Sequence, residues 1–502
     1  MKIAIAYPSL ESKKGVPLLS QNRQFQWFKS PTYIYPVVPA YAATLLNKAG
    51  YEVCWLDGIA EKWTYKQWLE QLKEAKPDMV VMETKTPVIK KHWKIINQLK
   101  KLDTGYWKLA TVLVGDHVTA LPKESFKNSQ VDYVLTGGDY DFLLLNLVNH
   151  LANKARLEPG IWYKQRVGNE KWEVKNTGKF VLNHDLNKLP FIDRDLTKWQ
   201  LYAFKNGNYK HPPGTYIMAG RDCWHRLNGG CTFCAWTTLY PQYRVRSPEN
   251  VLQEIDVLIN KYKVKEIMDD TGTFPTGNWL KKFCQGMIKN GFHKKINFDC
   301  NLRFGALIKK DYTLMAKAGF RLLLFGLESL SQKTIDKLNK NIRVLDVEKE
   351  LKLIQGVNKQ EVGHLEPHLT FMIGYPWETK KQALNTLNFA KSMFQKGYID
   401  TLQATVMIPY PGTKLFAEAK QKNWLKTLDW SQYDMKQPVL KSRLADKEIL
   451  VITQGIYKSF LTPKFFIKKI TSIKSFDDVK FYIRAAKQVI GHILDFLPSK
   501  NS

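Results

Sequence analysis

The stretch RDCWHRLNGGCTFCAW, from Arg221 to Trp236, contains three of the six cysteines of this 502-residue chain. Cys223, Cys231 and Cys234 fall within twelve residues. A structural zinc site or a closed iron–sulfur cluster is normally held by four protein ligands. Three thiolates on a cluster of four irons leave one iron without a protein ligand, and that iron can bind a substrate. The missing fourth cysteine therefore predicts an open cluster.

Two other uses of these thiols stay open at this point. A Cys-x-x-Cys pair binds zinc in many proteins, and His225 would then supply a fourth ligand. The same pair forms a redox-active disulfide in some oxidoreductases. The sequence around the stretch has to distinguish between these uses.

The cysteine stretch follows the first strand of a repeating β-α series. From Gly214 onward we expect six strands, TYIMAG, EIMDD, INFDCN, RLLLFGLE, LTFMIGYP and LQATVMIPYP, with helices between them. The clearest helix begins at Ser247-Pro248-Glu249, where a capping serine precedes a proline at the first helical position. Six such units predict a partial (βα)6 TIM-like barrel over residues 211–415, with chemistry at the carboxyl ends of its strands.

The first 150 residues show an earlier α/β pattern. Near-continuous apolar segments such as KIAIAYP and DMVVMET alternate with amphipathic helices, which predicts a Rossmann-like, doubly wound parallel sheet. Such sheets bind ligands at the carboxyl ends of their strands. The residues at those ends include Tyr7, Asp57, Thr84, Gly115, Asp116, His117, Gly137 and Gly138.

Two regions lack this alternation. Residues 151–210 are predicted to form a linker that packs on both neighbours, with a small hairpin around Gly168-Asn169. Residues 416–502 have no strand pattern and are expected to be helical. Their lysines interleave with aromatic residues. That pattern is typical either of peripheral contact with a membrane or a lipid-like substrate, or of a helical cap with a solvated lysine face.

Composition and charge bear on the classes of partner and on the cellular location of the protein. The chain has 76 Lys and Arg against 46 Asp and Glu, a net charge of +30. This charge permits contact with nucleic acid, anionic lipid or an acidic substrate, and a Lys-rich solvated surface explains it equally well. Six cysteines are too few for a disulfide framework, and MKIAIAYPSL lacks the apolar core of a secretory signal. No apolar run approaches the roughly 18 residues of a membrane span, so we expect a cytoplasmic protein without a transmembrane segment.

The cysteine stretch and the motifs after it resemble the radical S-adenosylmethionine (SAM) superfamily. CTFC places an aromatic residue between the last two cysteines, at the end of the first barrel strand. The motifs MDDTGTF, CNLRFG, GLES, IGYPWET and IPYPGT follow in order, each at the end of its own strand. The first gap departs from the pattern, because the usual spacing is Cys-x3-Cys-x2-Cys and this chain has Cys-x7-Cys-x2-Cys. The departure affects the expected geometry of the loop, which contains Gly229-Gly230, more than the expected cluster.

The resemblance implies a [4Fe-4S] cluster on Cys223, Cys231 and Cys234, with SAM bound at the open iron. In that superfamily one electron through the cluster cleaves SAM to a 5′-deoxyadenosyl radical, which abstracts hydrogen from an unactivated carbon. A flavodoxin or ferredoxin is the expected electron donor. The residues implied in binding SAM are Phe233, Asp269, Asp270, Thr271, Arg303, Glu328, Ile373, Pro376 and Pro409.

The first domain resembles the cobalamin (vitamin B12)-binding domain that precedes the barrel in one large subfamily. The matching segments are YPVVPAYAATLLNKAGYEV, KPDMVVMET, LVGDHVTALP and VDYVLTGGDYDFLL. The resemblance implies that cobalamin contacts Thr84, Gly115, Asp116, His117, Gly137 and Gly138. The motif Asp-x-His-x-x-Gly, which supplies the lower ligand of cobalt in many cobalamin proteins, is absent, because His117 follows Asp116 directly. Either cobalamin binds without a protein ligand to cobalt, or the domain keeps only the fold.

These resemblances imply a cobalamin-dependent radical SAM enzyme that methylates an unactivated carbon of a small-molecule or lipid-like substrate. Three alternatives remain open. A radical SAM enzyme can cyclise or oxidise its substrate without methyl transfer, or it can modify RNA. The chain has no recognisable RNA-binding module, which argues against a nucleic acid partner. A sensor would bind the same cofactors without catalysis.

Overall fold

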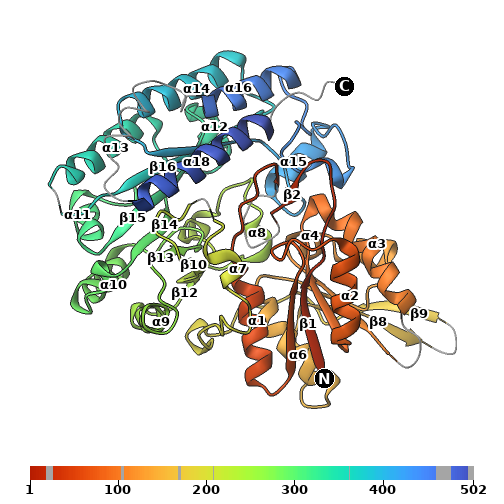
Figure 1. Ribbon diagram of the computed structural model, residues 1–502. Coiled ribbons are helices and arrows are strands. Elements are labelled where there is room, and N and C mark those ends of the chain that lie inside the picture. Colours follow the sequence, from red (N-terminus) through yellow and green to blue (C-terminus); the bar gives the residue numbers. More distant parts are fainter. Residues whose placement is uncertain are drawn as a thin grey trace.

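The computed structural model describes residues 1–18, 26–102, 107–167, 171–206, 208–360, 362–458 and 476–495. Two sheets of mainly parallel strands lie next to each other, and helices flank both (Figure 1). Additional helices near the C-terminus pack against the second sheet (Figure 1). The predicted fold class, a Rossmann-like sheet followed by a partial barrel and a helical region, is confirmed.

The first sheet has seven strands in the order β4-β1-β5-β6-β7-β8-β9. The strands are β1 (Lys2–Tyr7), β4 (Glu52–Asp57), β5 (Met79–Glu83), β6 (Ala110–Val114), β7 (Tyr133–Leu135), β8 (Ile161–Val167) and β9 (Lys171–Asn176). The first five are parallel and follow the order 2-1-3-4-5 of doubly wound sheets. β5 is buried along its whole length because helices cover both faces of the sheet.

The helices of this domain fall on two sides of the sheet (Figure 1). They are α1 (Val37–Lys48), α2 (Tyr65–Ala75), α3 (Ile89–Leu99), α4 (Asp116–Ala120), α5 (Pro122–Asn128) and α6 (Tyr140–Leu151). α1 and α6 pack together on one side. α2 begins at a capping box in which Thr64 and Gln67 satisfy each other's backbone N–H groups.

The hairpin that we placed in the linker belongs to the first sheet. β8 pairs antiparallel with β7, and β9 pairs with β8, so this sheet extends to Asn176. The rest of the linker contacts both neighbours. Tyr202 donates a hydrogen bond of 2.5 Å to Asp57 in the first domain, and Arg194 donates to Thr215 of β10 at 2.6 Å. The linker thereby holds the two sheets in a defined relation.

The second sheet has six parallel strands in chain order. They are β10 (Gly214–Ile217), β13 (Glu266–Asp269), β14 (Asn297–Leu302), β15 (Phe320–Glu328), β16 (Glu366–Ile373) and β17 (Thr401–Val406). The helices between them are α9 (Pro248–Asn260), α10 (Gly277–Lys289), α11 (Lys309–Lys317), α12 (Gln332–Lys337), α13 (Val344–Asn358) and α14 (Lys380–Gln395). The edge strands β10 and β17 do not pair with each other, so the barrel stays open.

The C-terminal region is helical only in part. It contains α15 (Lys414–Gln421), α16 (Asp446–Lys458) and α18 (Phe476–Asp495). Between α15 and α16 an irregular segment reaches the first domain, where Trp430 donates to Glu124 at 2.9 Å. Part of the basic, aromatic stretch lies outside the described residues. No helix in the described part of the chain is long and apolar enough to cross a bilayer.

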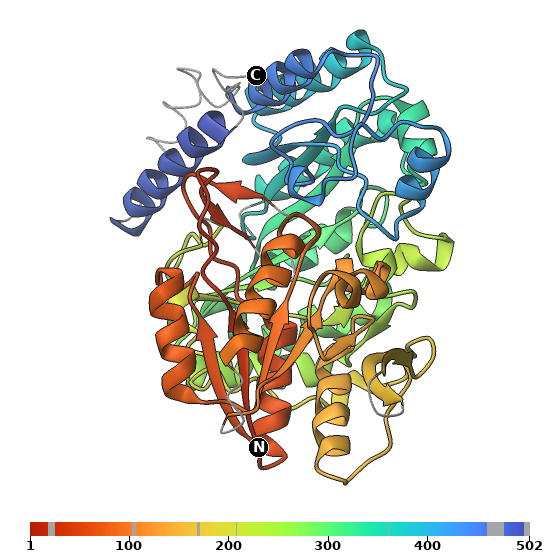
Figure 2. The same cartoon turned by 90° about the vertical axis from the view of Figure 1, so that its right-hand side faces the viewer.

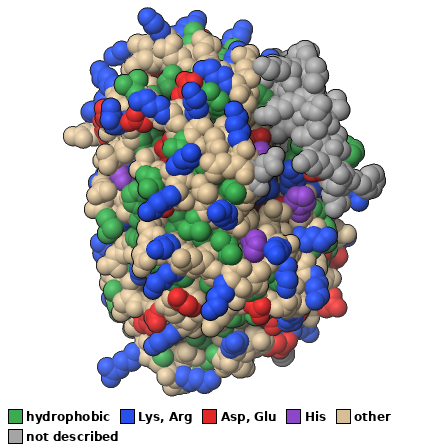
Figure 3. Space-filling model, turned by 90° about the vertical axis from the view of Figure 1, so that its left-hand side faces the viewer, with side chains coloured by type: hydrophobic (Ala, Val, Ile, Leu, Met, Phe, Trp, Pro, Cys, Tyr) green, Lys and Arg blue, Asp and Glu red, His purple; other side chains and the backbone are tan. Residues whose placement is uncertain are grey.

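Lys and Arg side chains are scattered over the outer face of the barrel (Figure 3). They alternate there with apolar and uncharged side chains and do not form a continuous stripe. The cationic side chains on this face are therefore dispersed, as on a solvated surface.

A buried charge network joins the first domain to the barrel. Asp139, at the start of α6, accepts hydrogen bonds from Arg221 at 2.8 Å and from Arg244 at 2.6 Å. Its other oxygen lies 3.1 Å from Nδ1 of His184 in the linker. Burial opposes ionisation of Asp139, but the Arg221 guanidinium holds the pKa of this carboxyl well below its usual range. Because Arg221 lies two residues before Cys223, this network anchors the base of the cysteine stretch.

We expect replacement of His184 by Gln to lower the free energy of unfolding only at low pH. Burial alone would lower the pKa of His184, but hydrogen bonds to Asp139 and Glu158 raise it above its ordinary value. The folded protein therefore binds this proton more tightly than the unfolded chain. The stabilisation is complete below the ordinary pKa of about 6.5 and is lost as pH rises through the folded pKa.

Urea unfolding of the wild type and His184→Gln should differ by less than about 1 kcal/mol at pH 6, because the histidine is partly exposed. As pH rises through the folded pKa of His184 the difference should vanish. His150→Gln, an exposed histidine at the end of α6, is the matched control and should show no such trend. A His184→Gln effect that grows with pH would contradict the assigned ion pairs.

Candidate active site

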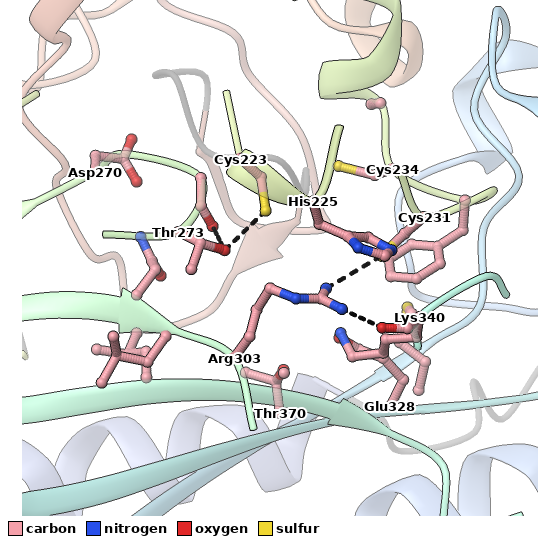
Figure 4. Close-up of a pocket in the computed structure, with 18 of the residues that line it drawn as sticks. Cys223, His225, Cys231, Cys234, Asp270, Thr273, Arg303, Glu328, Lys340 and Thr370 are labelled. Carbon is pink, nitrogen blue, oxygen red and sulfur yellow. Dashed lines mark hydrogen bonds and ion pairs between the residues drawn. The ribbon is translucent and has the colours of Figure 1, made fainter. Parts of the chain in front are cut away.

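A cavity of about 220 Å³ opens at the carboxyl ends of the barrel strands. Cys223, Cys231 and Cys234 all line it, together with side chains from every strand of the second sheet (Figure 4). The strand residues include Tyr216, Met268, Asn301, Leu324, Thr370 and Gln403. The cysteines therefore converge at the end of the barrel where catalytic groups are expected.

The long first gap folds into a helical turn, Trp224–Asn228. The Asp222 carboxylate pairs with the guanidinium of Arg226, with 2.9 Å between Oδ1 and Nη2. Gly229 and Gly230 then adopt φ values of 82° and 66°, which L side chains rarely reach, and the chain reverses toward Cys231. The extra residues are thus absorbed in a compact turn, and Cys231 lines the same cavity as Cys223 and Cys234.

Asn339 holds this turn from the neighbouring loop. Its side-chain amide donates to the carbonyls of Asn228 at 3.0 Å and Gly230 at 2.8 Å. Nε2 of His225 lies 2.6 Å from the Asn339 carbonyl and donates to it. With Nε2 used in this way, only Nδ1 of His225 is left for a metal.

The thiols have polar neighbours suited to a bound cluster. Cys223 lies 2.9 Å from the Thr273 hydroxyl, and Cys231 lies 3.8 Å from the Arg303 guanidinium (Figure 4). Burial raises the pKa of Cys223, so its thiolate needs a cationic partner. Within the described ranges no three His, Cys, Asp or Glu side chains surround one ion-sized point.

An ion pair that the sequence did not reveal lies in the same cavity. The Lys340 ammonium is 2.8 Å from the Glu328 carboxylate, and both side chains are about 7% exposed. Glu328 has φ of 71°, a strained value for this residue, at a bulge between β15 and β16. Arg303 also donates a hydrogen bond to the Lys340 carbonyl. Lys340 follows α12 and belongs to no motif, so only the fold brings it to the site.

Four of the nine residues expected to bind SAM line the cavity: Phe233, Asp270, Arg303 and Glu328. The other five, Asp269, Thr271, Ile373, Pro376 and Pro409, are buried and lie outside it. Their neighbours Met268, Gly272, Met372, Ile408 and Tyr410 line it instead. Successive side chains of a strand point to opposite faces, so a motif can be assigned correctly while its inward residue is misjudged by one.

Asp269 and Thr271 contact the backbone that follows β10 and do not line the cavity. The Asp269 carboxylate accepts hydrogen bonds from the backbone N–H of Ala219 at 2.6 Å and of Thr271 at 3.0 Å. The Thr271 hydroxyl accepts from the N–H of Gly220 at 2.9 Å. Burial raises the pKa of Asp269 to about 6. These groups fix the chain that leads from β10 to Cys223.

The residues expected to contact cobalamin gather at the carboxyl edge of the first sheet, but none of the six lines the cysteine cavity. Thr84 bonds His92 at 2.8 Å, and Asp116 lies 3.7 Å from the ammonium of Lys85. Gly115 must be glycine, because a Cβ would lie 2.4 Å from the Thr84 carbonyl oxygen. These contacts tie the ends of β5 and β6 together.

The other residues of this group face protein as well. Both ring nitrogens of His117 are engaged, Nδ1 with Thr86 and Nε2 with Glu124, each at 3.1 Å. A Cβ on Gly137 would lie 2.5 Å from the Phe180 ring, and one on Gly138 would lie 1.8 Å from the Tyr240 ring. His117 is thus not available as a ligand to cobalt in this conformation.

Besides Lys340, three more cavity residues come from segments without a motif. Ile34 belongs to the first domain, Asn208 to the linker and Met435 to the irregular C-terminal segment. No sequence signal identified them. Ile34 also lines a second cavity of about 30 Å³ at the ends of β1 and β4, next to Tyr7 and Asp57. The two cavities therefore share a wall.

Comparison with known proteins agrees with this geometry. Residues 219–390 match the family model described as the radical SAM superfamily. The uncharacterized methyltransferase PH0819 of Pyrococcus horikoshii is 26% identical over 442 residues, which are 87% of this chain and 90% of that protein. The anaerobic magnesium-protoporphyrin IX monomethyl ester cyclase of Cereibacter sphaeroides is 25% identical over 444 residues, 86% and 67% of the two chains.

A solved structure shares the fold of almost the whole chain. The cobalamin-dependent S-adenosylmethionine radical enzyme OxsB, with aqua-cobalamin and S-adenosylmethionine bound, superimposes with a TM-score of 0.67 at 15% identity. The match covers 98% of this chain and 72% of OxsB. The ordered motifs, the cysteine cavity and the family match agree: residues 219–390 match the radical SAM superfamily, and the chain shares the fold of the cobalamin-dependent radical enzyme OxsB.

Proposed function

We propose that this protein binds a [4Fe-4S] cluster through Cys223, Cys231 and Cys234 and uses it to cleave SAM reductively. The observation that carries the proposal is the convergence of three thiols, and no fourth, on one cavity. Cys54, Cys284 and Cys300 are all described and do not line it. A cluster held there keeps one iron open to SAM.

The bound cofactors supply the radical chemistry, and the chain has to position them and exclude water. Arg303 places positive charge 3.8 Å from the sulfur of Cys231, one of the proposed cluster ligands. We assign Glu328 to the ribose hydroxyls of SAM, because its carboxylate faces the cavity and Lys340 holds it in place at 2.8 Å. Asp270 also faces the cavity and suits the methionyl ammonium. Phe233, between the last two cysteines, suits an adenine face.

We extend the proposal to cobalamin at the carboxyl edge of the first sheet. The support is the shared fold with a cobalamin-bound enzyme over 98% of the chain. In the present conformation the 30 Å³ cavity at that edge is far too small for a corrin, and residues 32–36 form part of its wall. Binding therefore requires this cover to move. Because both nitrogens of His117 are engaged, we propose that cobalt has no histidine ligand.

The reaction that we propose is methylation of an unactivated carbon, and the similarity to PH0819 supports it. A second candidate is radical cyclisation without methyl transfer, which is favoured by the similarity to the magnesium-protoporphyrin cyclase over 444 residues. Both reactions need a reduced electron donor. We therefore place the protein in the reducing cytoplasm, as expected from its few cysteines.

Anaerobic reconstitution with iron and sulfide tests the cluster. The wild type should bind about four irons per chain and release 5′-deoxyadenosine from SAM after reduction with dithionite. Cys231→Ala should lose both properties at least about tenfold, since a [4Fe-4S] cluster needs its thiolates. Cys54→Ala, a cysteine in β4, is the matched control and should behave like the wild type. Zinc in the purified protein in place of iron would exclude the proposal.

Cobalamin binding is tested by spectroscopy and does not depend on turnover. After incubation with hydroxocobalamin and desalting, the protein should keep the visible bands of the corrin. Electron paramagnetic resonance of the bound cobalt(II) form should show no nitrogen splitting that changes when the histidines of the protein carry nitrogen-15, because His117 is engaged with Thr86 and Glu124. Bands that are lost on the column would reject binding. Splitting from a histidine nitrogen would show that this region rearranges to supply a ligand.

Methyl-deuterated SAM distinguishes the two reactions once a substrate is found by product profiling in cell extract. A methyltransferase should yield a product heavier by a deuterated methyl group. A cyclase or oxidoreductase should release 5′-deoxyadenosine and yield a product without label. Cys231→Ala in the same extract is the control for background methylation. Unlabelled product formed together with 5′-deoxyadenosine would replace the methylation proposal with the second candidate.

A further inference from the structure

The turn between the first two cysteines is exposed at its tip. Leu227, Asn228 and Gly229 are exposed, and Leu227 is 80% accessible. This tip is only two residues from Cys231 along the chain, whereas the cysteines face the cavity. The segment that supplies the cluster ligands is thus also protein surface, with a large apolar side chain at its centre.

Exposed lysines lie on two elements that contact the cysteine stretch. The ammonium of Lys414 is 3.9 Å from where a Cβ on Gly229 would lie. The backbone carbonyl of Thr232 accepts from the N–H of Leu415 at 2.9 Å, which fixes the start of α15 against the cysteine stretch (Figure 2, blue beside yellow-green). On the other side, the N–H of Thr232 donates at 3.0 Å to the backbone carbonyl of Leu338, the residue after Lys337.

We call Leu227, Gly229, Lys333, Lys337 and Lys414 the loop face. Lys333 and Lys337 are one helical turn apart on α12. All three lysines are exposed, and none has an ion-pair partner in the described part of the chain. Lys337 instead lies over the Trp377 ring, 4.6 Å from its centroid. The charges on this face are therefore available to a partner.

The surrounding sequence keeps this face positive. Residues 224–232, 333–343 and 413–426 contain nine Lys and Arg and two acids, Asp336 and Glu418. Five of these cations pair with carboxylates, and the four others are Lys333, Lys337, Lys414 and Lys420. Glu418 is neutralised by Lys422 at 2.6 Å. An exposed apolar centre with a basic rim suits a transient interface with an acidic protein, because opposite charges speed encounter without requiring a large buried area.

We propose that the loop face docks an acidic, low-potential electron-carrier protein. The inference rests on the proposed function, because the cluster has to be reduced before it can act. One electron leaves the carrier, which is oxidised by one unit, and enters the cluster, which is reduced by one unit. No bond forms or breaks in this step. The turn that binds the cluster is at the same time the contact surface, so the electron crosses only the thickness of that turn.

The test compares two reductants with the reconstituted full-length enzyme. Release of 5′-deoxyadenosine is measured with dithionite and with an acidic flavodoxin kept reduced. The variant is Lys337→Glu/Lys414→Glu, which reverses two charges outside the cavity. Its matched control is Lys281→Glu/Lys282→Glu, which are also exposed and outside the cavity. They belong to α10, which lies on the outer side of the barrel (Figure 1).

With flavodoxin at low ionic strength, the loop-face variant should be slower by about tenfold, and added salt should shrink the difference. With dithionite it should match the wild type, and the control variant should match it with both reductants. An unchanged rate with flavodoxin would overturn the docking proposal while leaving the proposed function intact. A loss with dithionite as well would also overturn it, since the face would then serve the substrate or the fold. No release from the wild type with dithionite would reject the proposed function itself.

Discussion

The arrangement of the site depends on how one turn is held. The Asp222–Arg226 pair closes the residues between the first two cysteines into a compact helical turn, and Asn339 anchors that turn to the loop after α12. Without these contacts a gap of seven residues would leave Cys231 free to occupy many positions, and ordering it would cost conformational entropy on cluster binding. The pair and the amide therefore prepare a ligand geometry that the spacing alone does not define.

Three further contacts determine where this turn sits in the molecule. Arg221, the first residue of the stretch, binds Asp139 of the first domain. Thr232, which follows the turn, is bonded through its backbone to Leu338 after α12 and to Leu415 at the start of α15. The stretch is thus fixed to the first sheet on one side and to the C-terminal part of the barrel on the other. A buried charged pair such as Arg221 and Asp139 is specific because an unpaired charge at that depth would be costly. The contacts that dock the first domain against the barrel therefore also position the cysteine stretch.

The cavity combines local strain with buried charge. Glu328 has a left-handed backbone conformation at a bulge, and its carboxylate is matched by Lys340. The cost of such a conformation is normally offset by the surrounding fold and is typical of functional positions. On the first sheet, by contrast, the side chains at the strand ends satisfy one another, and His117 is enclosed by Thr86 and Glu124. The barrel side of the site is therefore open to a ligand, while the first-domain side is closed.

The sequence by itself determined the order of the two α/β units, the three cysteines and the motifs at successive strand ends. These features are local, since apolar periodicity, capping residues and short spacings act within a few turns of chain. Which side chain of each motif faces the cavity was decided only by tertiary structure, because a shift of one residue reverses the face of a strand, as Asp269 and Asp270 show. Lys340, Ile34 and Met435 likewise reach the site through contacts between distant segments, for which no local pattern exists. The hairpin of the linker belongs to the first sheet because β8 pairs with β7. This too is a contact between separate segments, and no local pattern predicts it.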